Sequence, residues 1–333
     1  MNDAVDALMR DYQGDVPGAS VLVIENGKSV VSRSYGRADL EARVAASPRT
    51  NYRLASVSKQ FTAASVLLLA QDGKLGLDDP VRKWLPSLPG SADAITLKHL
   101  LTHTSGLIDY EDVMAQDATE NEQVHDADVL RLLESQDRTY FVPGSDYRYS
   151  NSGYALLALI VEKASGKPYA AFLHDRIFAP LGMSHTVAYE KGVSTVTDRA
   201  YGYSLVGGKW QRTDQSSTSA VLGDGGIYSS IDDLAKWDAA LYDDRLLNAQ
   251  SRKLAATPWT KTDDPAVQYG YGWRISGDSQ WHSGETIGFR NVIVRYPKAR
   301  LTVVVLTNRD DPEPYRKAQQ IAALFLLSSK PTQ

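Results

Sequence analysis

The chain has 333 residues, of which 43% are apolar and 23% charged, and its formal net charge is −4. These values are ordinary for a globular protein and exclude a disordered or fibrous chain. Acidic and basic residues are interspersed without a basic stripe, so nucleic acid is not expected as a partner. The chain has no cysteine, which excludes disulfides, thiolate catalysis and zinc-thiolate sites together.

The N-terminal residues predict an amphipathic helix. Val5, Leu8, Met9 and Tyr12 fall at helical spacing, with acidic residues in the first turn. The segment lacks the basic start and the continuous apolar run of a signal peptide. No apolar run in the chain approaches the length of a membrane span. We therefore expect a helix docked on the protein and no membrane-spanning segment.

Both ends of the chain predict antiparallel strands. Residues 18–36 contain two β-branched runs joined by Asn26 and Gly27, which is a strong hairpin signal. Residues 289–297 and 299–309 form two further strand-like runs, and a helical pattern follows them. The two ends are thus expected to supply strands to one sheet, together with the helices that cover it.

The periodicity between these ends is mostly helical, and clusters of Gly and Pro separate the segments. The expected helices cover residues 61–72, 97–101, 126–133, 153–163, 169–177 and 231–242. This order predicts an α/β (α+β) fold, in which an antiparallel sheet built from both chain ends is flanked by helices and carries an inserted, mostly helical region. We place the sheet domain at residues 1–75 and 226–333 and the helical domain at 76–225.

Residues 52–63 place two serines and a lysine at the start of a helical pattern. Ser56 and Lys59 are three residues apart, so one helical turn brings the lysine amine within reach of the serine hydroxyl. A lysine held among apolar neighbours loses proton affinity and can accept the serine proton. The alternative is a chance match, because so short a pattern recurs by accident in a chain of this composition.

A second motif, Tyr149-Ser150-Asn151, lies directly before a strongly apolar helical pattern. One interpretation is structural: Asn151 or Ser152 caps the helix, and Tyr149 is a partly buried ring. The other is functional: the phenol of Tyr149 transfers protons, and the amide of Asn151 holds the carbonyl of a substrate amide or ester.

A third motif, His282-Ser283-Gly284, leads into a predicted strand. A lone histidine can be a structural group whose hydrogen bonds are satisfied. In the functional interpretation, Gly284 permits close approach of backbones, so that the extended segment pairs with a substrate while a backbone N–H stabilises an oxyanion.

His99 and His103 form a fourth candidate, because four-residue spacing places both on one helical face, where they could ligate a metal. No glutamate follows His99 as in a zincin helix, and no third ligand is evident. We therefore expect neither a metal nor another cofactor.

The three motifs "SVSK", "YSN" and "HSG", in this order, resemble the active-site motifs of the serine β-lactamase and penicillin-recognising superfamily. The likeness is closest to the branch with class C β-lactamases, DD-peptidases, D-aminopeptidases and esterases. Flanking stretches such as "GKLGLDDPVRKWLP", "ITLKHLLTHTSGL" and "DGGIYSSIDDLAKW" extend the resemblance over nearly the whole chain. It implies a sheet domain and a helical domain with the active site in the cleft between them, and it makes "HLLTHTSGL" structural.

The resemblance also implies roles for the first two motifs. Ser56 would be the nucleophile at a helix N-terminus and Lys59 its activating base. Tyr149 would relay a proton to the leaving group, and Asn151 would contact the substrate amide. Ser58 points around the helix from the amine, so we assign it to packing.

For the third motif, the resemblance implies that His282, Ser283 and Gly284 line the substrate along the strand that edges the site. The backbone N–H groups of Ser56 and Glu285 would form the oxyanion hole. His282 stands where many relatives carry the lysine of a KTG motif, and it would be at most partly cationic at neutral pH.

Glu285 is a second departure from the family pattern, because its carboxylate follows the HSG motif where a substrate carboxylate would bind. Like charges would repel there unless Arg290 or Arg274 compensates. We therefore favour ester hydrolysis, or hydrolysis of peptides recognised by another end, over efficient β-lactam or DD-carboxypeptidase activity. The alternatives are a true class C-like β-lactamase, a D-alanyl-D-alanine carboxypeptidase, and a catalytically weak relative that binds peptidoglycan or a partner protein.

The expected ligand is a small or peptide-like substrate, with a covalent β-lactam adduct possible in principle. Loops around residues 108–125 and 185–225 would set substrate choice. Family habit favours a periplasmic or secreted protein whose signal peptide is absent from this sequence, and the cytoplasm is the alternative. The sequence leaves the oligomeric state open.

Overall fold

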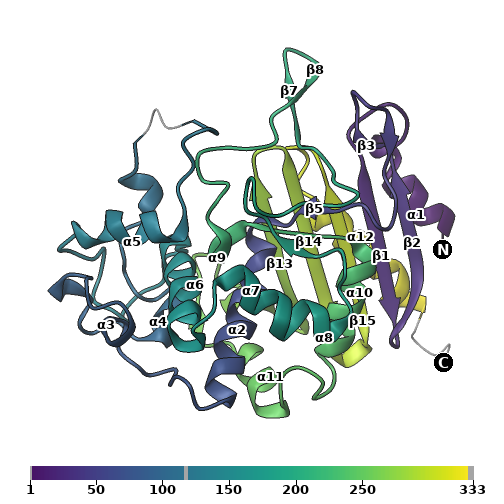
Figure 1. The fold of residues 1–333 in the computed structure, drawn as a ribbon. Helices are drawn as coiled ribbons and strands as arrows, with labels where there is room; N and C mark the ends of the chain where they lie inside the picture. The colour runs from purple at the N-terminus through teal and green to yellow at the C-terminus, as the bar shows by residue number, and fades with distance from the viewer. Residues whose placement is uncertain (1, 116–118, 329–333) are drawn as a thin grey trace.

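The computed structural model describes residues 2–115 and 119–328 (Figure 1). Its main feature is an eight-stranded antiparallel sheet with strand order β10-β11-β12-β13-β14-β15-β1-β2. The strands are β1 (Ala19–Glu25), β2 (Lys28–Tyr35), β10 (Thr260–Lys261), β11 (Gln268–Tyr269), β12 (Arg274–Ser276), β13 (Ser279–Thr286), β14 (Phe289–Tyr296) and β15 (Leu301–Thr307). Both ends of the chain therefore build one sheet, which confirms the predicted fold class.

The hairpin β1–β2 turns at Asn26 and Gly27, whose φ angles are 52° and 77°. Two successive positive φ angles are typical of the type I′ turn, which Asn-Gly adopts with little strain. Strand β1 then pairs with β15 on its other side, and Val23 lies opposite Val303. The N-terminal hairpin is thus joined to the C-terminal strands in the interior of the sheet.

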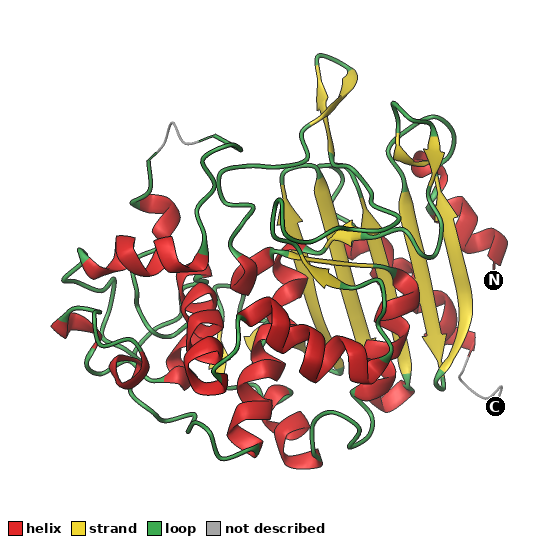
Figure 2. Cartoon of the chain, viewed as in Figure 1, coloured by secondary structure: helices red, strands yellow, loops and turns green. Residues whose placement is uncertain are grey.

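Side chains alternate along the strands, so each face of the sheet packs into a separate hydrophobic core. Val21 and Val23 pack with helices α1 (Asn2–Leu8) and α12 (Tyr315–Ser328) on one face. Leu22 and the other inward side chains of the opposite face pack under α2 (Lys59–Gln71) and α10 (Ile231–Ala240). This period-two alternation is the sheet pattern expected when both faces are covered (Figure 2).

The region between the sheet segments is mostly helical, and it lies beside one end of the sheet (Figure 1). Its helices are α3 (Val81–Trp84), α4 (Leu97–Leu101), α5 (Asp126–Glu134), α6 (Asn151–Ser165), α7 (Tyr169–Leu173), α8 (Ala179–Leu181) and α9 (Leu222–Gly225), and α11 (Ala249–Ala255) follows later in the chain. The division into domains at residues 75/76 and 225/226 remains a prediction.

Short strands connect the helical region to the sheet. They are β5 (Tyr52–Arg53), β6 (Val187–Ala188) and β9 (Ile227–Ser229) in a three-stranded sheet, and the pairs β3 (Arg37–Asp39) with β4 (Val44–Ala45) and β7 (Tyr203–Val206) with β8 (Lys209–Arg212). The β7–β8 hairpin projects from the body of the protein (Figure 2).

Several predicted helix boundaries need correction. The helix expected over residues 169–177 consists of α7, which ends at Leu173, and a π-helical turn over His174–Phe178. Helix α6 begins after Ser150, whose side chain accepts a hydrogen bond from the Gly153 N–H at 3.1 Å. The prediction of Asn151 or Ser152 as the N-cap is therefore wrong.

None of the helices within residues 2–115 and 119–328 combines the length and the apolar character needed to cross a bilayer.

Candidate active site

A tight turn after β5 presents Ser56. Residues Ala55–Ser58 form a 3₁₀ turn that leads into α2, and Ala55 adopts a φ of 50°, which is unfavourable for a residue with a side chain. The Leu54 N–H anchors the turn by donating to the Ile227 carbonyl at 2.8 Å. Lys59, the first residue of α2, is fully buried, and its Nζ lies 3.0 Å from Ser56 Oγ.

Three acceptors surround the Lys59 amine. Nζ donates to Ser56 Oγ at 3.0 Å, to Asn151 Oδ1 at 2.8 Å and to the Asp224 carbonyl at 2.9 Å. Two of the three are carbonyl oxygens, which can only accept a hydrogen bond. With two substituent positions of Nζ directed at these carbonyl oxygens, the third points toward Ser56 Oγ.

Asn151 also contacts a carboxylate. Because Ser150 caps the helix, the Asn151 side chain is free to reach the site, where its Nδ2 donates to Glu111 Oε1 at 3.0 Å. Burial, followed by the nearby Asp109 carboxylate, raises the pKa of Glu111 above its ordinary value. Glu111 lies within the loop that we expected to govern substrate choice, but no motif in the sequence predicted its contact with Asn151.

Asp224 is the other acidic residue that sequence reasoning missed. Its carboxylate accepts a hydrogen bond from the Tyr110 hydroxyl at 3.1 Å, and burial raises its pKa to about 7. The carboxylate of Asp126 holds the preceding turn by accepting from the N–H groups of Leu222 and Gly223 at 2.9 and 3.0 Å. The Gly-rich run at residues 223–226 is a local signal of a tight backbone beside Asp224.

Tyr149 lies beside Lys59 without a hydrogen bond to it. The Lys59 Nζ is 4.9 Å from the centre of the Tyr149 ring, and His103 stacks against the same ring at 4.3 Å. The Tyr149 hydroxyl is buried and has no hydrogen-bond partner among the described residues. Tyr149 lines the larger hollow together with Ser56.

His103 is a structural residue and not half of a helical metal site. Helix α4 ends at Leu101, and His103 follows it with a φ of 59°, so the expected placement of His99 and His103 on one helical face is wrong. The Ser150 N–H donates to His103 Nδ1 at 3.0 Å, which secures the start of α6. The described part of the chain contains no cluster of three or more His, Cys, Asp or Glu side chains able to hold a metal.

His282 is buried and neutral. Its Nδ1 donates to the Ser283 carbonyl at 2.6 Å, so its Nε2 accepts from the Tyr269 hydroxyl at 2.8 Å. Burial, and then the Arg274 guanidinium, lower the pKa of His282 well below its ordinary value. This direction agrees with the expectation that His282 is at most partly cationic at neutral pH.

Gly284 brings β13 against the turn that holds Ser56. A Cβ at this position would lie 2.0 Å from the Leu54 carbonyl oxygen and 3.1 Å from the Val57 nitrogen. Only glycine permits this approach. The approach explains why Glu285, the next residue, lines the same cavity as Ser56.

Two adjoining hollows meet at Ser56, Asn151 and Glu285, which line both of them. The larger has a volume of ≈ 240 Å³, and most of the predicted site residues line it: Ser56, Tyr149, Asn151, His282, Ser283 and Glu285, joined by Arg274. The smaller, of ≈ 50 Å³, is polar and contains Glu111 and Asp224. The structure therefore brings the three sequence motifs to one place.

Charge is distributed unevenly over these hollows. Arg274 stands at the Tyr149 side, with its guanidinium 5.4 Å from the centre of that ring. Glu285 and Glu111 stand at the other side, where the buried Arg53 also lines the smaller hollow. The Arg290 Nε lies 3.9 Å from the Glu285 carboxylate, which is a long ion pair in a half-exposed position, so Arg290 compensates this charge weakly.

Known proteins share this architecture. The chain is 32% identical to penicillin-binding protein 4* of Bacillus subtilis over 94% of its own length and 72% of the relative's. It is also 32% identical to protein flp of Staphylococcus aureus, but it spans 60% of that protein's length. A penicillin-binding protein homologue from Pyrococcus abyssi, which is octameric, superposes with a TM-score of 0.86 at 28% identity, covering 98% of this chain and 76% of that one.

A D-amino acid amidase from Ochrobactrum anthropi SV3, solved with L-phenylalanine, superposes with a TM-score of 0.82 at 25% identity over 99% of both chains. The fold, together with these relatives, defines the protein as a serine hydrolase. The chain belongs to the beta-lactamase family, whose sequence model, described as Beta-lactamase, matches residues 1–327.

Proposed function

We propose that the protein hydrolyses an ester or amide through a covalent acyl-enzyme on Ser56. The observation that carries this proposal is the 3.0 Å contact between Ser56 Oγ and the fully buried amine of Lys59. A serine hydroxyl is a weak nucleophile until an adjacent base accepts its proton. Lys59 is the base within reach of Ser56 Oγ among the described residues that contact it.

In the first step, the neutral amine of Lys59 accepts the proton of Ser56 as Oγ bonds to the substrate carbonyl carbon. The two N–H groups that remain on the amine donate to Asn151 Oδ1 and to the Asp224 carbonyl, which leaves the lone pair directed at Ser56. The negative oxygen of the tetrahedral intermediate would accept from the backbone N–H groups of Ser56 and Glu285.

In the second step, the bond between the carbonyl carbon and the leaving group breaks, and the leaving group takes a proton through the Tyr149 hydroxyl. The unpartnered, buried state of that hydroxyl supports this assignment. Water then attacks the acyl-enzyme, and Ser56 recovers its proton. His282 contributes no charge, and it positions β13 through its bonds to Tyr269 and to the Ser283 carbonyl.

The carboxylates favour a substrate that carries an ammonium group near the scissile carbonyl. Glu111 and Glu285 line the hollow next to Ser56, and both would repel a substrate carboxylate placed there. Arg53 lines the same hollow, but one of its terminal nitrogens is engaged with the Ser219 carbonyl at 2.8 Å. Amides and esters of amino acids fit this charge, and one structural neighbour is a D-amino acid amidase. β-Lactams and D-alanyl-D-alanine peptides carry a carboxylate and fit it less well.

One observation favours the second candidate, a β-lactamase or a D-alanyl-D-alanine carboxypeptidase. Arg274 lines the larger hollow together with Ser56 and Tyr149, where a guanidinium could bind a substrate carboxylate. The two candidates differ in which end of the cavity receives the charged group of the substrate, and a substrate panel distinguishes them.

Intact-mass measurement after incubation with p-nitrophenyl esters, D-amino-acid amides and β-lactams tests the proposal. A mass increase that is present in the wild type and absent in Ser56→Ala is expected. Equal labelling of the two proteins contradicts the role of Ser56, and a protein that no probe acylates would be a binding relative. Rapid turnover of a chromogenic cephalosporin would contradict the preference for ammonium substrates and support the second candidate.

A further inference from the structure

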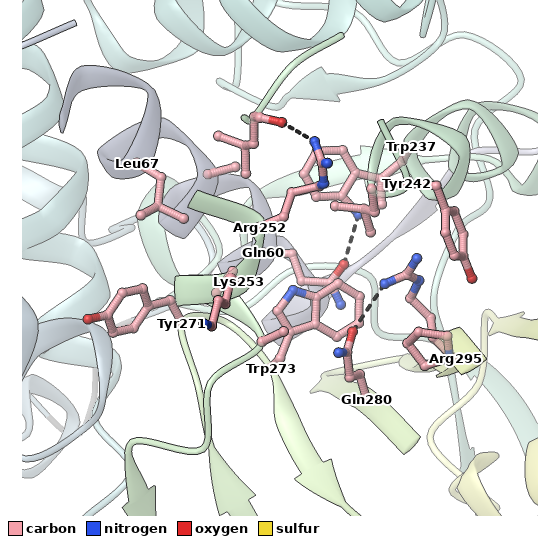
Figure 3. Close-up of a pocket in the computed structure, with 16 residues that line it drawn as sticks. Gln60, Leu67, Trp237, Tyr242, Arg252, Lys253, Tyr271, Trp273, Gln280 and Arg295 are labelled. Atoms are coloured by element: carbon pink, nitrogen blue, oxygen red, sulfur yellow. Dashed lines mark hydrogen bonds between the residues drawn. The ribbon is translucent and has the colours of Figure 1, made fainter. Parts of the chain in front are cut away.

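A second cavity lies beside helix α2 and shares no lining residue with the two hollows around Ser56 (Figure 3). Gln60, Ala64 and Leu67 face it from α2, at the i, i+4, i+7 spacing of one helical side. The loops and helices after α10 and the strands β13 and β14 close the other sides, through residues such as Tyr242 and Arg295.

The walls of this cavity are largely apolar, and four aromatic side chains contribute to them. Trp237, Tyr242, Tyr271 and Trp273 line it, and all of them except Tyr242 are buried. The volume is ≈ 230 Å³. An engineered apolar cavity of about 150 Å³ already admits benzene, so this space can hold a small aromatic or short aliphatic group. Half-exposed residues at its rim give access from solvent.

Two residues that line the cavity carry buried hydrogen-bond donors without partners among the described residues. Gln60 and Arg295 are 2% and 4% exposed, and Gln60 Nε2 and Arg295 Nη2 make no hydrogen bond among the described residues. Buried donors of this kind are rare in native proteins, because each unpaired one costs about 1–3 kcal/mol.

The orientation of both groups is fixed by their other bonds. Gln60 Oε1 accepts from the indole N–H of Trp237 at 3.0 Å, which can only donate, so the amide nitrogen is the unpaired atom (Figure 3). Arg295 donates from Nε to Asp238 Oδ1 at 2.7 Å and from Nη1 to Gln280 Oε1 at 3.1 Å. Its Nη2 is the remaining terminal nitrogen.

All the charged side chains that line the cavity are positive. Its lining includes the cations Arg252, Lys253 and Arg295 and contains no carboxylate. Arg252 and Arg295 are paired with acidic residues outside the lining, and Lys253 is exposed at the rim. The cavity therefore combines aromatic and aliphatic walls, two lining residues with unpaired donors, and a positively charged rim.

We propose that this cavity is a binding site for a small carboxylate with an aromatic or short aliphatic body. The carboxylate would accept hydrogen bonds from Gln60 Nε2 and Arg295 Nη2, and the apolar body would lie against Trp237 and Trp273. Charge-assisted hydrogen bonds and burial of the apolar body supply the affinity. The site is separate from Ser56 and does not depend on the proposed hydrolase activity.

Calorimetric titration with 3-phenylpropanoate tests this site, and 3-phenylpropylamine serves as the probe of opposite charge. Each probe is titrated into the wild type and into protein whose Ser56 has been blocked with a fluorophosphonate. Ser56→Ala replaces the blocked protein if blocking fails. The carboxylate is expected to bind and to quench tryptophan fluorescence, and the amine is expected to bind at least tenfold more weakly. Loss of carboxylate binding on blocking Ser56, or equal binding of both probes, overturns the proposal.

The variant Gln60→Glu localises the binding. Glutamate keeps the acceptor for Trp237 but replaces the unpaired donor with a like charge, so the dissociation constant should rise at least tenfold. Gln71→Glu is the matched control, because it makes the same charge change on the same helix outside the cavity and keeps an acceptor for the Asn248 N–H. Equal affinity of Gln60→Glu and the wild type contradicts the site.

A second variant covers the case in which Gln60→Glu does not fold. Ala256→Phe places a ring in the cavity from its half-exposed rim and leaves both donors intact. It should abolish binding of 3-phenylpropanoate while the thermal unfolding midpoint stays close to that of the wild type. Unchanged binding in a folded Ala256→Phe protein overturns the assignment to this cavity.

Discussion

Glu111 accepts a hydrogen bond from Asn151 Nδ2 at 3.0 Å, and the same Asn151 accepts one from Lys59 at 2.8 Å. The Asn151 amide thus links the buried Lys59 amine to the Glu111 carboxylate. The carboxylate lies in the hollow that Ser56 lines, so it can meet the charged end of a substrate. This relationship gives the first prediction.

Glu111→Gln should reduce activity selectively toward substrates with a free ammonium group. Glutamine keeps an acceptor for Asn151 but removes the charge, so kcat/KM for a D-amino-acid amide should fall about tenfold relative to its N-acetyl derivative. Steady-state kinetics on the two substrates measure the ratio. Glu122→Gln, in the same loop region but outside the site, is the control. An unchanged ratio in Glu111→Gln would show that Glu111 does not contact the ammonium group.

The two serines of the SVSK motif should behave differently on truncation. Ser56→Ala should abolish acylation. Ser58 is fully buried, and its Oγ accepts from the Ile227 N–H at 3.3 Å, so Ser58→Ala should lower the free energy of unfolding by about 1 kcal/mol and retain acylation. Intact-mass labelling and urea unfolding measure the two effects. Loss of acylation in a folded Ser58→Ala protein is the contrary result.

Gly284→Ala should destabilise the protein and misplace the turn that holds Ser56. The added Cβ would meet the Leu54 carbonyl oxygen at 2.0 Å, and backbone can yield only by moving. We expect a loss of at least about 3 kcal/mol in unfolding free energy. Gly225→Ala is the control for stability, because its Cβ would lie 3.5 Å from the Ala55 backbone, in ordinary contact. Similar unfolding curves for both variants would contradict the close approach.

Asp224 should make stability fall as the pH rises through neutrality. Burial raises its pKa to about 7, well above the ordinary value of an aspartate, so the folded state binds the proton more tightly than the unfolded chain. The stability from this group is fully present below about pH 4 and is lost as the pH rises through about 7, with a slope of up to about 1.4 kcal/mol per pH unit.

Asp224→Asn isolates that contribution. Asparagine keeps an acceptor for the Tyr110 hydroxyl but cannot titrate, so its unfolding free energy should vary less between pH 5 and pH 8 than that of the wild type. Urea unfolding across this range provides the comparison. Asp126, whose pKa is also raised to about 7, leaves a residual slope in the variant. Identical pH dependence in both proteins would refute the assignment to Asp224.

The sequence predicted the elements whose signals are local. Asn26 and Gly27 define the hairpin because two positive φ angles suit those residue types. The spacing of Ser56 and Lys59 predicted their contact, because residues three apart on a helical turn share a face. Their catalytic roles remain proposals, but the distances that those roles require are present.

The parts that the sequence did not predict depend on contacts between distant segments. Asp224 reaches the site because α9 packs against α2 and α6, and Glu111 because Ser152 of α6 accepts from the Tyr110 N–H and donates to the Ile108 carbonyl. The loop of residues 108–125 was expected to matter, and its Glu111 lines the site, while residues 116–118 lie outside the described residues. The charge of His282 likewise depends on burial, which a lone histidine in a sequence does not reveal.

The pairing of β1 with β15 sets a condition on how the sheet can form. Glu25 pairs with Leu301, so the two strands meet across almost the whole chain, and closing a loop of that length costs roughly 5 kcal/mol of chain entropy. During synthesis, β1 and β2 emerge early, and one edge of β1 lacks its partner until β15 has left the ribosome. Its apolar residues Val21 and Val23 belong to the core that this pairing completes. The nascent chain therefore carries an unpaired strand edge through most of its translation, and a chaperone that protects this edge from aggregation must release it before β15 can pair.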